Sequence, residues 1–152
     1  MIRLDKIGAD SHIVSVKLAT NMKQGNVVKL NGLVEGEREV YNAVAPAAAT
    51  DKIVVLTTPF HPYSTSEDER TFTLKAGKPQ RGHYLTSGDI ITVTEDLIQG
   101  TATKNQFVVI QANEKLKASE TAVESSVVFA VDDIENSVPE FFGAKGIVLK
   151  VL

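Results

Sequence analysis

Short segments of alternating apolar and polar side chains run through the chain and predict β-strands. In His12–Leu18 two valines and a leucine fall on one side and a serine and a lysine on the other, the period of a strand with one solvated face. Ile53–Leu56 and Phe107–Ile110 are apolar without interruption, as expected of strands covered on both faces. No long segment has the period of a helix.

The strand-like segments recur roughly every 8–15 residues and are separated by turn residues, a pattern typical of sandwiches and barrels. The sequence therefore predicts an all-β, mainly antiparallel, single-domain sandwich or barrel of roughly ten short strands with at most one or two short helices. The other strands expected are Asn26–Leu30, Val40–Val44, Arg70–Leu74, Lys115–Ala118, Val127–Val131 and Ile147–Leu152.

The stretch Gly82–Gln111 predicts the centre of the fold. Turns are expected at Ser87-Gly88 and at Gly100, so that the three strands they separate would form an antiparallel meander. Within it, Thr92 and Thr94 alternate with apolar residues and are expected to face solvent.

Four irregular segments complete the prediction. Residues 1–10 can form an extended N-terminal arm, and Asn31-Gly32 is a strong tight-turn dipeptide. Residues 58–69 contain two prolines that cannot both donate to a sheet, which predicts a long loop of the kind that often binds partners. Val138–Gly143 is expected to be a turn or a single helical turn.

Length and composition narrow the class of protein. The 152 residues suggest one domain, numbered 1–152, and the absence of cysteine excludes disulfides and thiolate metal sites. No apolar run approaches the ~18 residues of a membrane span. The charged N-terminal segment does not resemble a signal peptide, so we expect synthesis and retention in a cytoplasm.

Charge is distributed unevenly along the chain. The net charge of −3 argues against binding to a nucleic-acid backbone. Basic side chains dominate residues 1–30, namely Arg3, Lys6, Lys17, Lys23 and Lys29 against Asp5 and Asp10. Residues 118–144 contain no Lys or Arg but carry Glu120, Glu124, Asp132, Asp133, Glu135 and Glu140. Such asymmetry indicates two solvated faces, or charge-complementary contact between copies or with one large partner.

Catalytic or metal chemistry has little support in the pattern. The three histidines, His12, His61 and His83, lack local metal-ligand spacing; His61 with the acids of residues 67–69 is the one conceivable cation site. The carboxylate pairs at 95–96 and 132–133 are adjacent residues, which on a strand point to opposite faces. No serine sits in a nucleophile elbow and no glycine-rich loop opens a helix. We therefore predict no enzyme, and no catalytic, cofactor or metal site.

Aromatic side chains in irregular segments are better candidates for a functional surface. Phe60 and Tyr63 lie in the proline-containing loop, and Phe141 and Phe142 precede a glycine. Such residues either cap the core beneath their own loop or anchor a partner protein.

The order of these segments resembles the small β-rich proteins of tailed bacteriophages that are encoded near the major capsid protein and act as head decoration, or capsid cement, proteins. The segments that carry the resemblance are VSVKLA, QGNVVKLNGLVEGEREVYNAVAP, TDKIVVLTTP, RGHYLTSGDIITVTEDLI and GAKGIVLKVL. They span most of the chain, and each is a strand-and-turn phrase rather than a chemical signature. Residues 119–142 lie outside the resemblance.

The resemblance implies a structural virion protein that binds the outer surface of a phage capsid and stabilises the head lattice. Its partners would be the major capsid protein and other copies of the chain, with a trimer one arrangement open to it, and neither nucleic acid nor membrane. It would be made in the host bacterial cytoplasm and lie on the capsid surface. The residues expected at the partner interface are Arg3, Lys6, Phe60, Tyr63, Phe141 and Phe142.

Three alternatives remain open at the level of sequence. Strand-and-turn phrases do not separate head from tail, so a tail or baseplate component is the nearest. A β-sandwich that binds a ligand such as carbohydrate could use the loop aromatics, although the chain contains no Trp. A small β-barrel hydrolase could use His61 or His83, but no nucleophile is identifiable.

Overall fold

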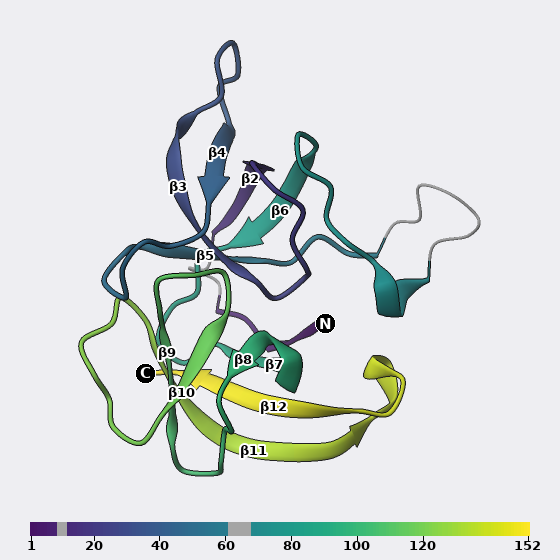
Figure 1. The fold of residues 1–152 in the computed structure, drawn as a ribbon, viewed down its shortest axis with the longest axis vertical. Helices are drawn as coiled ribbons and strands as arrows, with labels where there is room; N and C mark the ends of the chain where they lie inside the picture. The colour runs from purple at the N-terminus through teal and green to yellow at the C-terminus, as the bar shows by residue number, and fades with distance from the viewer. Residues whose placement is uncertain (9–11, 61–67) are drawn as a thin grey trace.

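The computed structural model describes residues 1–8, 12–60 and 68–152 and has an all-β fold (Figure 1). In these ranges twelve strands form two sheets, so the predicted class is confirmed, with slightly more strands than the ten or so expected. Helical structure in the described residues is limited to three single 3₁₀ turns, η1 (Glu69–Thr71), η2 (Glu95–Leu97) and η3 (Pro139–Phe141).

Five strands close into a small barrel in the order β2-β4-β3-β5-β6. Only the β2–β4 pair within it is parallel. The barrel strands are β2 (Ile13–Leu18), β3 (Val27–Leu33), β4 (Val40–Val44), β5 (Ile53–Leu56) and β6 (Pro79–His83).

The other seven strands form an open sheet in the order β1-β7-β12-β11-β9-β10-β8, antiparallel except for β8–β10. Its long β11–β12 hairpin extends beneath the barrel in Figure 1. The strands are β1 (Ile2–Lys6), β7 (Ile90–Thr94), β8 (Ile98–Gln99), β9 (Phe107–Ile110), β10 (Leu116–Ser119), β11 (Val128–Val138) and β12 (Ala144–Val151).

Strand β5 is apolar throughout because it separates two hydrophobic cores. Ile53 and Val55 pack into the larger core, which the barrel shares with the open sheet. Val54 and Leu56 point the other way, into the barrel interior. All four side chains are buried, which confirms the predicted central strand and ties the two sheets together.

The segment Arg70–Leu74, predicted as a strand, is not one. Residues 69–71 form η1, and Leu74 contributes only an isolated bridge to Met22. The alternation that suggested a strand has another cause: Phe72 and Leu74 are both buried in the barrel core.

The predicted meander of Gly82–Gln111 is also wrong in its pairing. Strand β6 belongs to the barrel, whereas β7 pairs with β1 and β12, and β9 pairs with β10 and β11. The chain crosses between the sheets at residues 84–89, where the buried Asp89 carboxylate accepts a hydrogen bond from the Thr86 amide at 2.8 Å. The turn at Ser87-Gly88 was predictable from its own residues, but the pairing partners of each strand depend on segments that are distant in the sequence.

Two shorter predictions need correction. Asn31-Gly32 does not end a strand, because β3 continues through it with a register shift between Leu30 and Leu33, and the chain turns at residues 34–37 instead. Residues 2–6, expected in an extended arm, pair with β7 as an edge strand of the open sheet.

The C-terminal hairpin extends the predicted strands. Strand β11 is longer than the predicted Val127–Val131 and carries two irregularities, between Val131 and Asp133 and between Glu135 and Val138. In β12, Ile147, Leu149 and Val151 are all buried, which confirms that they share one face.

Candidate functional site

A groove of about 260 Å³ runs beside the first strand, between the open sheet and the barrel. Ile2, Arg3 and Leu4 of β1 line it together with Phe60, Arg81 and Phe141. We call it the β1 groove. It brings together three of the six residues that the sequence predicted for a partner interface, Arg3, Phe60 and Phe141, of which the first and last are more than 130 positions apart in the chain.

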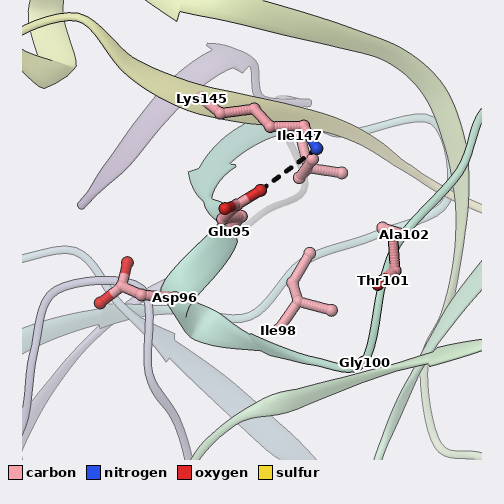
Figure 2. Close-up of a pocket in the computed structure, with 8 residues that line it drawn as sticks. All are labelled: Glu95, Asp96, Ile98, Gly100, Thr101, Ala102, Lys145 and Ile147. Atoms are coloured by element: carbon pink, nitrogen blue, oxygen red, sulfur yellow. Dashed lines mark ion pairs between the residues drawn. The ribbon is translucent and has the colours of Figure 1, made fainter.

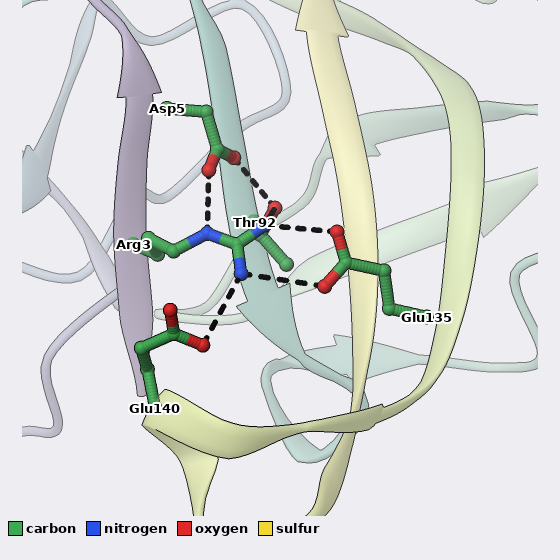
Figure 3. Close-up of polar contacts among 5 residues, drawn as sticks. All are labelled: Arg3, Asp5, Thr92, Glu135 and Glu140. Carbon is green, nitrogen blue, oxygen red and sulfur yellow. Dashed lines mark hydrogen bonds and ion pairs between the residues drawn. The ribbon is translucent and has the colours of Figure 1, made fainter.

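Arg3 is held by acids from two other parts of the chain (Figure 3). Its guanidinium donates to both oxygens of Glu135, at 2.9 and 3.3 Å, and also to Asp5 and Thr92. Glu140 adds an ion pair at 3.5 Å. The hydrogen bonds that Arg3 donates to Glu135 and then to Asp5 raise the pKa of Arg3, so this cation is engaged within the molecule and ties β1 to the rest of the open sheet.

The Arg3 and Asp5 side chains cover the face of β7 that was expected to be exposed to solvent. Thr92 is fully buried, and its hydroxyl donates to Asp5 at 2.6 Å. Gly146 leaves room on the neighbouring strand: a Cβ there would lie 2.6 Å from Val138 and 2.8 Å from Thr92. The alternation in β7 therefore separates two buried faces, one apolar and one polar.

Some charges of the acidic and basic segments of the sequence pair with each other within the chain. Glu135 and Glu140 from the acidic stretch meet Arg3 from the basic segment, and Asp133 pairs with Lys104 at 3.0 Å. Opposite charges separated in sequence thus meet within one chain.

The two neighbouring phenylalanines of the η3 turn face in different directions. Phe141 is buried, whereas Phe142 is 54% exposed. Phe142 has φ 55° and ψ 37°, the left-handed conformation in which a bulky side chain is rare. The Arg70 guanidinium lies 5.4 Å from the centre of its ring.

Arg70 is itself fixed by Asp68. The guanidinium donates two hydrogen bonds to one carboxylate oxygen, at 2.6 and 3.1 Å. These bonds lower the pKa of Asp68 to about 2. Sequence reasoning missed Arg70 because its role depends on the η3 turn, which lies about 70 residues further along the chain.

The remaining nominated residues differ in their surroundings. Phe60 packs edge-on against Phe72, with ring centres 5.2 Å apart, and also lines the β1 groove. Lys6 is exposed and forms no ion pair with any described residue. Tyr63 and His61 lie outside the described residues; Asp68, one of the acids of the conceivable cation site, is described and binds Arg70.

Strand β1 presents an unpaired edge to the groove. The amide of Thr94 donates to the carbonyl of Met1, and Arg3 pairs opposite Thr92. In an antiparallel ladder the backbone groups of Ile2 and Leu4 then point away from β7, on the side where the described chain provides no further strand.

Arg81 faces this edge from the barrel. One guanidinium nitrogen donates to the Thr57 carbonyl at 3.2 Å, but its buried Nε has no hydrogen-bond partner among the described atoms. Leaving a buried donor unpaired costs about 1–3 kcal/mol. No local motif distinguishes Arg81 in the sequence.

His83 is a core histidine. It is 6% exposed, and its Nδ1 lies 2.6 Å from the Thr57 hydroxyl. Burial, followed by the charge of Arg81, lowers its pKa below the ordinary 6.5.

A second hollow, of about 330 Å³, lies at η2 (Figure 2). Glu95 pairs there with Lys145 at 3.2 Å, while Asp96 pairs with Lys23 at 2.7 Å. The two carboxylates were expected on opposite faces of a strand; they lie instead in a 3₁₀ turn, yet still point to different partners. Each is neutralised by its own lysine.

Within the described ranges no three His, Asp or Glu side chains gather as a metal site. No helix in the same ranges is long and apolar enough to cross a membrane.

Comparison with known proteins gave no match to a protein-family model, a curated protein or a solved structure.

Proposed function

We propose that this chain is a structural virion protein that binds the outer surface of a tailed-phage capsid and stabilises the head lattice. The resemblance of its strand-and-turn segments supports the virion role. The observation that carries the proposed contact is Phe142, an exposed phenylalanine in a left-handed backbone conformation beside the β1 groove residue Phe141.

Phe142 contributes little to the stability of the isolated chain. A bulky residue with positive φ is strained by about 1–3 kcal/mol, and a ring that is 54% exposed recovers little of this through burial. Strained backbone and exposed aromatic rings are both typical of binding sites, where the ring becomes buried against a partner.

Arg70 prepares the ring for such a contact. Because Asp68 holds the guanidinium and the guanidinium lies over the ring, Phe142 has fewer orientations to lose on binding. Aromatic and arginine side chains together are the most common anchors of protein interfaces.

A capsid makes a modest contact sufficient. The lattice presents many identical sites at fixed spacing, so weak contacts by several linked copies add to tight attachment. The proposal involves no catalytic step, and it places the protein in the assembled virion after synthesis in the host cytoplasm.

Phe142→Gly separates binding from stability. Glycine adopts positive φ freely, so we expect the free energy of unfolding to stay constant or rise by up to about 1 kcal/mol. Loss of an aromatic anchor should weaken binding to each capsid site about 30-fold, corresponding to ~2 kcal/mol. Co-sedimentation with heads of the phage that encodes the chain measures this affinity and the number of copies bound.

Leu33→Ala is the matched control, because Leu33 is 49% exposed but lies on the β3–β4 hairpin. It should bind heads like the unaltered protein. Equal binding by Phe142→Gly would remove Phe142 from the interface. Saturable binding to purified tails rather than heads would replace the capsid proposal with a tail component.

A further inference from the structure

A second groove lies on the other side of the seam between barrel and sheet. In Figure 1, η1 and η3 lie at the right, and the segments 45–52 and 120–127 lie at the left. Two hollows of about 420 and 440 Å³ adjoin there and share Leu85, Ser126 and Val127. We call them together the Lys52 groove, because Lys52 lines its barrel end.

Backbone hydrogen bonds hold the walls of this groove. The Ser126 amide donates to the Ala49 carbonyl at 2.9 Å, which joins the segment before β11 to the barrel. The Tyr84 amide donates to the His12 carbonyl at 3.0 Å. The groove therefore exists before any partner binds.

Its charge is one-sided on a chain whose net charge is negative. Lys52 supplies its charge, and no described Asp or Glu lines either hollow. Lys52 forms no ion pair with a described residue, and its ammonium lies 5.1 Å from the centre of the Tyr84 ring. Four other lysines, at positions 23, 29, 104 and 145, are paired with carboxylates.

The rest of the groove is largely apolar. Leu85 and Val127 are partly buried against the shared core and leave one side open to the groove. Leu152 lines the far end and is 56% exposed. A cation at one end and an apolar track leading away from it define the chemistry of a complementary partner.

We propose that the Lys52 groove binds an extended polypeptide segment of another protein, with a carboxylate side chain beside Lys52 and apolar side chains over Leu85 and Val127. Two hollows joined end to end suit a linear chain better than a compact ligand. Lys52, which forms no ion pair with a described residue, selects the carboxylate. This inference does not rest on the capsid proposal, because neither Phe142 nor β1 lines the groove.

The probe is a fluorescein-labelled peptide, Gly-Ser-Glu-Val-Thr-Val-Ser-Gly, titrated into the full chain and followed by fluorescence anisotropy. We expect saturable binding at one site. Lys52→Ala should weaken it about fivefold, and so should Gln in place of Glu in the peptide. The two changes together should weaken binding no more than either alone, because both remove the same ion pair.

Two further variants test whether binding depends on the groove rather than on exposed lysines in general. Lys117→Ala removes an exposed lysine from β10 and should leave binding unchanged, whereas Leu152→Ser should weaken it. Absence of binding, equal binding by Lys52→Ala, or equal binding of a peptide in scrambled order would overturn the proposal. A dimer that light scattering detects and that Lys52→Glu dissociates would assign the groove to a second copy instead.

Discussion

The neighbours Phe141 and Phe142 illustrate what residue-level reasoning can predict. The sequence predicts a turn that places aromatic rings near the surface, but it does not say which ring docks. Docking of Phe141 depends on the space above Gly146, on a strand that follows the turn. The left-handed conformation of Phe142 then directs the second ring outward. The pattern identified the pair, and long-range packing distinguished its members.

His83 was considered for acid–base or metal chemistry, and its buried position beside Thr57 leads to a different expectation. Because folding lowers its pKa, the unfolded chain binds a proton more readily than the folded chain does. The stability contributed by neutral His83 is therefore present above pH 6.5 and is lost as pH falls below that value.

We expect the melting temperature to decrease as the pH is lowered from 7.5 to 5.5, a range above the pKa of most carboxylates. His83→Asn keeps a polar atom near Thr57 without the titration, so its melting temperature should change less over this interval. Parallel profiles for the two proteins would assign the pH dependence to other groups.

At the scale of elements, local pattern predicted strands better than it predicted their partners. The bounds of β4, β5 and β9 agree with prediction because turn residues flank continuous or alternating apolar runs. β1 was predicted as an arm because only Ile2 and Leu4 alternate there, and the acids that hold Arg3 lie elsewhere in the chain. Phe72 and Leu74 show the converse, since alternation also arises where a loop caps a barrel.

The open edge of β1 should be visible in amide hydrogen exchange. The Arg3 amide faces Thr92 and should be protected, whereas the Leu4 amide points into the β1 groove and should exchange rapidly. Two-dimensional NMR in D₂O resolves the two amides. Equal protection of Leu4 would mean that another strand covers this edge in solution.

The whole molecule is organised by the wall that its two sheets share. Ile53 and Val55 of the barrel pack in the same core as β7 and β12, so neither sheet keeps its hydrophobic face covered without the other. The all-β class was predictable from periodicity, whereas this division into a closed barrel and an open sheet was not. It depends on which side of β5 each neighbouring strand occupies.

We therefore expect barrel and sheet to unfold in a single transition, with equal calorimetric and van't Hoff enthalpies. Val55→Ala should lower the free energy of unfolding by ~2 kcal/mol and shift that transition as a whole. A two-step melt, with Val55→Ala affecting one step only, would show that the sheets are independent.

The irregular β11 strand has a consequence for the protein at high concentration. Beyond Val131 its outer edge has no partner strand in the described chain. Unpaired strand edges that are long and flat recruit other strands and aggregate. The two register shifts in β11 bend this edge, and Asp132, which is exposed and forms no ion pair with a described residue, places a negative charge on it. We expect the bends and the exposed Asp132 to disfavour pairing of this edge with a strand of another molecule.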